Sequence, residues 1–153
     1  MNTTETSAQS PSAGYWHLWC DTEGVTHQSH CRFDHLDLKT FAPPAKDLWV
    51  KQLAANPEDI TILILQPGTL DWHRNPQPQW IVPLSGSWFV ESMDGTRVEM
   101  GPGQLSFGED QLAKPDASGQ VGHLSGVIGK EPSVLMVVQI KDAPRIGAAC
   151  QVD

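Results

Sequence analysis

Residues 80–110, WIVPLSGSWFVESMDGTRVEMGPGQLSFGED, decide the fold because they contain several short strand-like runs separated by turns. Asp94-Gly95 and the Gly-Pro-Gly at 101–103 are turn signals, and the alternation at 97–100 favours a half-buried strand. A proline inside the first run is typical of an edge strand or a bulge. The stretch therefore predicts consecutive short strands.

Short strand-like runs separated by turns also lie on both sides of this stretch. A compact apolar run at 60–66, ITILILQ, lies between turn-forming residues and predicts a buried strand, whereas 71–79, DWHRNPQPQ, predicts a loop. Further strand-like runs are YWHLWC (15–20), VTHQSHCRFDHLDLKTF (25–41), HLSGVIG (123–129) and SVLMVVQI (133–140). Since no segment carries a helical apolar stripe over more than two turns, we expect an all-β sandwich or barrel. A closed barrel or jelly roll is favoured because it leaves few exposed edges.

Length and charge narrow the function classes. The 153 residues, of which 39% are hydrophobic, suit one domain, and we expect a flexible tail at 1–14, the β-domain at 15–141 and a polar tail at 142–153. Ten basic against 18 acidic residues give a net charge of −8, which offers no basic surface for nucleic acid. Because no apolar run approaches the roughly 20 residues of a membrane span and no signal peptide is recognisable, we expect a cytoplasmic protein without a membrane partner.

The three cysteines, Cys20, Cys31 and Cys150, are odd in number and lack CxxC spacing. This predicts neither a disulfide framework nor a zinc knuckle. Cys20 lies three residues from His17 and could serve as a nucleophile. A half-buried strand cysteine is the preferred interpretation, because nothing nearby would lower the pKa of its thiol.

The six histidines fall into two groups. Those crowded in the N-terminal strands are expected to face solvent, since His27 and His30 are three apart and point to opposite faces of a strand; the group comprises His17, His27, His30 and His35. His73 and His123 each lie next to a predicted strand. If those strands are neighbours, the two imidazoles converge in the barrel mouth, within reach of Gln79.

Five residues of the chain are spaced in a way that resembles the first motif of the cupin superfamily. That motif consists of a glycine, five residues, His-x-His, three or four residues, a glutamate, six residues and a glycine. The matching positions are Gly68, His73, Asn75, Gln79 and Gly86, with the first glycine one residue closer than usual. By this resemblance His73 is the first metal ligand, Asn75 replaces the second histidine and Gln79 replaces the carboxylate.

The second cupin motif is degraded. GPGQLSFGED at 101–110 keeps the glycine turn and the strand, but the motif's Pro-x-Gly is missing and its histidine is best matched by His123, about ten residues late. A narrower resemblance, covering roughly residues 16–141, is to small bacterial single-domain cupins. The matching segments are DWHRNPQPQW, VPLSG, MDGT, GPGQ, GED and GQVGH, in that order.

The resemblance implies a cupin-like β-barrel, a double-stranded β-helix or jelly roll, with a small-molecule pocket in its mouth. It also implies a homodimer, in which YWHLWC and DLWV at 47–50 could pair across the contact. Asn75 and Ile81 are expected in the pocket, because Ile81 shares a strand face with Gln79 while Trp80 lies on the other face.

The altered ligand set, His73, Gln79 and His123, places no negative charge on a bound dication. We therefore expect any divalent metal to be zinc, nickel or copper rather than iron or manganese. Asp71, Glu109 and Asp110 are alternatives for the missing carboxylate, since spacing does not show which way they point.

Two functions remain open at this stage. The first is a metal-dependent lyase or isomerase, in which the metal polarises a carbonyl and His73, His123 or Asp110 moves a proton. The second is a metal-free module that binds or senses a small ligand through the same polar groups. A dioxygenase is the least favoured activity because the carboxylate ligand is missing.

Overall fold

The computed structural model describes residues 11–40, 42–53 and 56–152, and within them the chain is all-β, with twelve strands and no helix. The predicted all-β class is confirmed. The strands are β1 Gly14–Cys20, β2 Thr26–Arg32, β3 Asp37–Lys39, β4 Leu48–Val50, β5 Pro57–Leu65, β6 Thr69–His73, β7 Gln79–Ser85, β8 Trp88–Ser92, β9 Arg97–Met100, β10 Leu105–Gly108, β11 His123–Val127 and β12 Ser133–Ile140.

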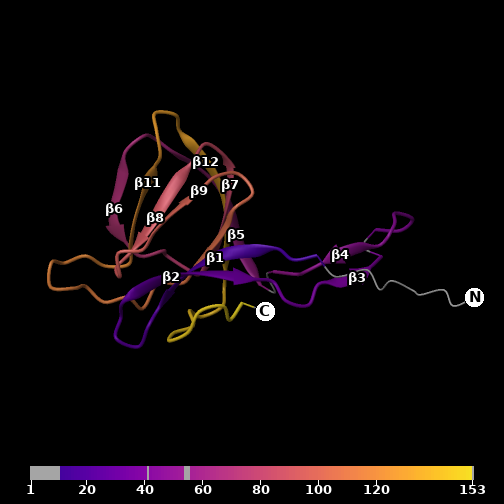
Figure 1. The fold of residues 1–153 in the computed structure, drawn as a ribbon, viewed down its shortest axis with the longest axis horizontal. Coiled ribbons are helices and arrows are strands. Elements are labelled where there is room, and N and C mark those ends of the chain that lie inside the picture. The colour runs from indigo at the N-terminus through magenta and orange to yellow at the C-terminus, as the bar shows by residue number, and fades with distance from the viewer. Residues whose placement is uncertain (1–10, 41, 54–55, 153) are drawn as a thin grey trace, which may run out of the picture.

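These strands form three sheets, none of which closes on itself in the described part of the chain. The largest has six strands in the order β2-β1-β10-β7-β12-β5, and a second has the order β6-β11-β8-β9. The remaining hairpin, β3-β4, projects from the body as an arm (Figure 1). Because β1 lies between β2 and β10, it has no free edge for pairing with a second chain.

Apolar side chains cover both faces of the six-stranded sheet. The inner core lies between the two large sheets and contains Leu18, Leu65, Ile81, Trp88, Val90, Val98, Met100, Val127, Leu135 and Val137. The outer core contains Tyr15, Cys31, Phe33, Trp80, Phe107, Ile140 and Val152. Each buried side chain contributes roughly 1.5–3 kcal/mol. Strand alternation explains the division, since Ile81 faces inward and Trp80 outward, as the sequence predicts.

The C-terminal segment, residues 142–152, packs on the outer face of the six-stranded sheet and lies under β1 and β2 in Figure 1. A disulfide joins Cys31 to Cys150 across 119 residues of sequence, and the Gly147 amide donates to the Cys20 carbonyl at 2.8 Å. The prediction of no disulfide is therefore wrong. Cysteine spacing cannot reveal a pair that only the three-dimensional fold brings together.

Two predictions about the centre of the chain also need correction. The run 60–66 forms the edge strand β5 rather than a buried strand, because it pairs with β12 alone and only Leu65 of β5 is buried. Residues 69–73, predicted as turn and loop, form strand β6. The described residues include no helix of the length and apolarity that crossing a membrane requires.

Candidate functional site

Strands β6 and β11 bring His73 and His123 together. The two residues are direct partners in the antiparallel ladder, and their ring centroids lie 4.4 Å apart. Gly122 makes this approach possible, because its φ is +77° and a Cβ there would overlap the carbonyl oxygen of His73. The convergence of the two imidazoles is thus built into the pairing of the strands.

Each imidazole is held through its Nδ1 atom. His123 Nδ1 donates to Oδ2 of Asp110 at 2.7 Å, and His73 Nδ1 donates to the backbone carbonyl of Asp71 at 2.6 Å. Because carbonyl and carboxylate oxygens only accept, a neutral ring in either place carries its proton on Nδ1 and leaves a lone pair on Nε2. Histidines that bind metals have this second-shell arrangement.

Asp110 fixes the orientation of His123. Its side chain is fully buried, and Oδ1 accepts from the backbone amide and the side-chain amide of Asn75, both at 3.0 Å. Gly108 leaves room for this contact, since a Cβ there would overlap Asn75 Nδ2. Three donors therefore point at one carboxylate, which acts through His123 rather than from the cavity wall.

A series of hydrogen bonds between side-chain amides continues from Asn75. Gln79 Nε2 donates to Asn75 Oδ1 at 2.8 Å, and Gln139 Nε2 donates to Gln79 Oε1 at 3.2 Å. Every donor in this chain points toward Asp110. Gln79 Oε1 keeps a second lone pair for a ligand or an ion.

The two histidines line a cavity of about 60 Å³ between the sheets. Its wall consists of Leu63, Leu65, Leu70, His73, Asn75, Gln79, Ile81, Trp88, His123, Ser125, Leu135 and Val137. Leu63 and Leu70, on the edge strands β5 and β6, are the exposed apolar residues of this wall and mark its opening. No lysine, arginine, aspartate or glutamate lines the cavity. Its volume is far below the several hundred Å³ of a drug-sized pocket, so a ligand has few heavy atoms.

The structure therefore places five predicted site residues on one cavity: His73, Asn75, Gln79, Ile81 and His123. None of the three candidate carboxylates belongs to this wall. The Asp110 side chain accepts a hydrogen bond from His123, and the Glu109 side chain accepts one from His17. Asp71 contacts His73 only through its backbone carbonyl. Within the described residues, no three His, Cys, Asp or Glu side chains are grouped as a metal site.

Two polar residues of this region are missing from the sequence-based prediction. Ser125 lines the cavity, and Gln139 donates a hydrogen bond to Gln79. Alternation in SVLMVVQI could have revealed the face of β12 that Gln139 shares with two lining residues, Leu135 and Val137. Its pairing with Gln79 becomes visible only in the ladder between β12 and β7.

A second buried histidine lies on the outer face of the same sheet. His17 Nε2 donates to Glu109 Oε1 at 3.0 Å, and its Nδ1 accepts from the amide of Cys150 at 2.9 Å. Arg145 Nε donates to the other oxygen of Glu109 at 3.2 Å. The prediction that His17 faces solvent is wrong, because β1 is an interior strand and the C-terminal segment covers it. This cluster attaches that segment to the sheet.

His27 joins two surface turns. Its Nε2 lies 2.7 Å from Asp21 Oδ2 and its Nδ1 lies 2.9 Å from Asp94 Oδ2. Partial burial lowers the pKa of His27, but the hydrogen bonds to the two carboxylates outweigh this effect and raise the pKa. Both ring nitrogens donate when the ring is protonated, so His27 is a structural clamp.

Cys20 has no features of a nucleophile. The thiol is buried, and burial together with the charge of Asp21 raises its pKa to about 11. A protonated thiol is a poor nucleophile at neutral pH. Cys20 lies on strand β1 as expected, but it is fully buried rather than half-buried.

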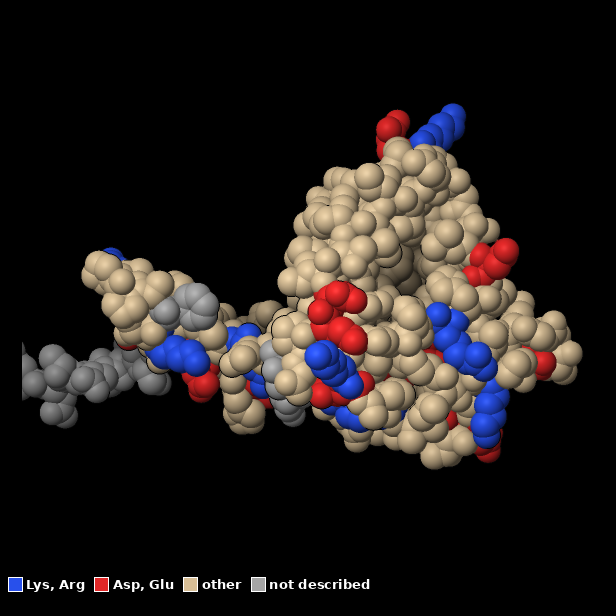
Figure 2. Space-filling model, turned by 180° about the vertical axis from the view of Figure 1, so that it is seen from behind, with Lys and Arg blue, Asp and Glu red and all other residues tan. Residues whose placement is uncertain are grey.

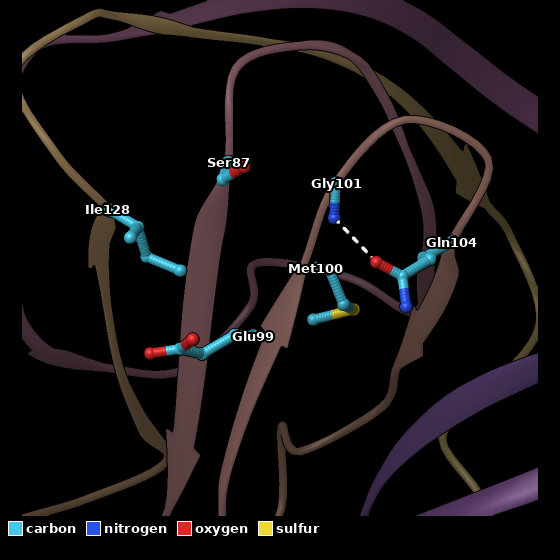
Figure 3. Close-up of a pocket in the computed structure, with 6 residues that line it drawn as sticks. All are labelled: Ser87, Glu99, Met100, Gly101, Gln104 and Ile128. Carbon is cyan, nitrogen blue, oxygen red and sulfur yellow. Dashed lines mark hydrogen bonds between the residues drawn. The ribbon is translucent and has the colours of Figure 1, made fainter.

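A larger hollow of about 240 Å³ opens near the turn after β9 (Figure 3). It is lined by Ser87, Glu99, Met100, Gly101, Gln104 and Ile128. The Gly101 amide donates to Gln104 Oε1 at 2.8 Å, which shapes the turn. Glu99 is the one titratable side chain in this wall, and it is exposed and lies 3.5 Å from Arg97. The lining offers no pair of reactive groups, so we place the site at the two histidines.

No protein-family model matches the chain, and no curated protein sequence matches it significantly. The interpretation of the site therefore rests on its residues and geometry.

Proposed function

We propose that this protein is a cupin-like jelly roll that binds a small oxygen-bearing organic molecule together with a divalent metal ion. The observation that carries the proposal is the pair of imidazoles, each held through Nδ1 with Nε2 free, on the wall of one cavity. Support for the jelly roll comes from two antiparallel-rich sheets that share one core.

The donor set fits a borderline metal. His73 and His123 would supply two neutral imidazole nitrogens, and Gln79 would supply an amide oxygen. Zinc, nickel and copper accept such ligands, whereas iron and manganese prefer a carboxylate in the set. When bound, the ion would supply Lewis-acid polarisation of a carbonyl group.

The cavity wall restricts the class of ligand. With no aspartate or glutamate side chain in the wall, an amine finds no counter-ion there. The leucine, isoleucine, valine and tryptophan side chains exclude water from the apolar part of the ligand. A molecule of few heavy atoms with a carbonyl or hydroxyl group fits this wall best.

Catalysis sets a further condition. A histidine whose Nε2 holds a metal cannot take a proton there, and the wall contains no other titratable side chain. Lyase or isomerase activity therefore requires at least one free imidazole, for which His123 is suited because its hydrogen bond to Asp110 fixes the orientation of the ring. The second candidate is a metal-free site that binds a small ligand by hydrogen bonds, and it is favoured by one observation: among the described residues no third His, Cys, Asp or Glu side chain joins the two histidines.

Metal analysis of protein purified without chelator or nickel resin tests the proposal. We expect close to one zinc, nickel or copper ion per chain, and loss of most of it in His73→Ala and His123→Ala. His30→Ala is the matched control, because His30 is an exposed strand histidine outside this cavity. Gln79→Glu should retain more metal and favour manganese or iron.

A protein that contains no metal and takes up none on titration with zinc would refute the metal-binding proposal. Small-ligand binding that depends on His123 would then establish the metal-free candidate.

A further inference from the structure

The C-terminal segment, residues 142–152, buries few of its own side chains. Val152 is its one buried residue among those that the structure describes, and Ile146, its other large apolar side chain, is 45% exposed. Hydrogen bonds also hold the segment, since the amides of Gly147 and Cys150 donate to groups of β1. A segment with so little buried apolar surface opens locally at a low cost in free energy.

A covalent bond completes this attachment. The segment is connected at one end to β12 and at the other end to β2, through the Cys31–Cys150 disulfide. Fixing both ends of a loop reduces the number of conformations open to it, so loss of the bond favours the undocked state. Cys31 is buried, whereas Cys150 is exposed and can be reached by a thiol.

The segment covers a histidine–carboxylate pair and part of an aromatic cluster. The side chains of His17 and Glu109 are 0% and 1% exposed. The centroid of the Phe107 ring lies 5.7 Å from that of His17, and the Arg145 guanidinium of the segment lies 5.7 Å from the same Phe107 centroid. Trp80 packs on Phe107 at a centroid distance of 4.7 Å. While the segment is docked, solvent and ligands therefore do not reach the pair.

The outside of this cover is polar. Asp142 and Gln151 are exposed, and Arg145 is half-buried. Figure 1 places the segment at the lower part of the body, and Figure 2 shows charged side chains of both signs gathered on that lower part, with few on the upper part. Undocking would expose aromatic side chains of the outer core in place of these polar groups, so the docked state is favoured while the disulfide is intact.

We propose that the C-terminal segment is a redox-controlled cover, and that reduction of the Cys31–Cys150 bond opens a second histidine–carboxylate site at His17 and Glu109. One thiolate of a dithiol reductant attacks Sγ of Cys150, and Cys31 leaves as a thiolate that takes up a proton. The second thiol of the reductant then attacks the mixed disulfide and releases Cys150. The products are two cysteine thiols and one oxidised, cyclic reductant.

Opening changes the state of the His17 ring. In the docked segment the Cys150 amide donates to Nδ1 at 2.9 Å, while Nε2 donates to Glu109 Oε1 at 3.0 Å. Undocking removes the first partner and leaves the second, so the lone pair on Nδ1 becomes available to a proton or an electrophile. The inference does not depend on the metal or ligand proposed above.

Diethyl pyrocarbonate, an electrophile that acylates unprotonated imidazole nitrogens, tests the proposal, with peptide mass spectrometry as the readout. In the oxidised full chain, the exposed His30 should be acylated and His17 should not. In Cys150→Ser, which lacks the disulfide without any reductant, His17 should react at least about tenfold faster. Cys20→Ser is the matched control, because it removes the free cysteine and leaves the bond intact, so its His17 should stay unreactive.

Hydrogen exchange provides a second measurement on the chain without substitutions. After reduction with dithiothreitol, the amides of Gly147 and Cys150 should exchange at least about tenfold faster, while those of β8 keep their protection. Protection lost throughout the chain would overturn the proposal, since the disulfide would then hold the whole fold. A His17 that stays unreactive in folded Cys150→Ser, or that reacts as fast as His30 in the oxidised chain, would also overturn it.

Discussion

Glu109 and Asp110 are neighbours in the chain, yet each holds a different buried histidine on a different side of the large sheet. Glu109 accepts a hydrogen bond from His17 on the outer side, and Asp110 accepts one from His123 on the cavity side. All four side chains are almost completely buried. The chemical pair is the same in both places, so the difference between them must come from the remaining ring nitrogen.

That nitrogen has a hydrogen-bond partner in the His17 pair, and in the His123 pair it has none among the residues that the structure describes. The amide of Cys150 donates to His17 Nδ1, so both nitrogens of this ring are bonded within the chain. The Nε2 atom of His123 instead belongs to a ring that lines the cavity. A buried histidine–carboxylate pair is therefore structural when both nitrogens are used, and available to a ligand when one is not.

The largest expected effect comes from disrupting the His17–Glu109 pair, in which both ring nitrogens have partners. His17→Ala leaves the buried Glu109 carboxylate with Arg145 as its remaining side-chain partner, and loss of the hydrogen bond to this charged group should cost about 1.5–3 kcal/mol in the free energy of unfolding. Chemical denaturation measures this loss. The exposed His30→Ala should change stability by less than about 0.5 kcal/mol. An equal effect in both variants would contradict the structural role of His17.

A substitution at Gly122 tests the two cavity histidines, because it should displace strand β6, which carries His73. In Gly122→Ala the new Cβ would overlap the His73 carbonyl and also disfavour the positive φ, so we expect β6 to shift and zinc affinity to fall by more than about tenfold. Gly119→Ala is the control, since Gly119 has a similar φ of +86° but open space around it. Calorimetric zinc titration of both variants distinguishes displacement of His73 from backbone strain alone.

Replacing each of the two carboxylates by its amide tests their roles separately. The first variant is Asp110→Asn. The amide keeps the shape of the side chain but removes the charged acceptor that orients His123, so zinc affinity should fall about 10–100-fold while the chain remains folded. Glu109→Gln should lower stability and leave zinc affinity unchanged. The opposite pattern would show that the assignment of the two neighbours is reversed.

The smallest effect concerns the exposed clamp at His27. Its folded-state pKa is raised, so its contribution is present below the ordinary value of 6.5 and is lost as pH rises through the raised pKa. Because the group is partly solvent-exposed, we expect no more than about 0.5 kcal/mol. Melting temperatures of the unmodified chain and His27→Gln should converge as pH rises. A gap that stays constant through this range would rule out the protonated clamp.

The sequence predicts the strands better than it predicts their surroundings. Alternation and turn residues identify most of the strands, and the positions of His73 and His123 beside strands predict their convergence. The burial of β5 is predicted wrongly because an apolar run has the same composition at the edge and at the centre of a sheet. His17 and the Cys31–Cys150 bond escape prediction because the C-terminal segment that covers them is polar in sequence and packs only through long-range contacts.

The central claim is that His123 and His73 present free Nε2 atoms while His17 does not. Long-range ¹H–¹⁵N NMR of the imidazoles, with and without zinc, tests it directly because it reports which nitrogen carries the proton. We expect the Nδ1–H form for His73 and His123, the Nε2–H form for His17, and a zinc-induced shift of Nε2 in the first two rings alone. An Nε2–H tautomer at His123, or a zinc response at His17 equal to that at the cavity histidines, would contradict the account.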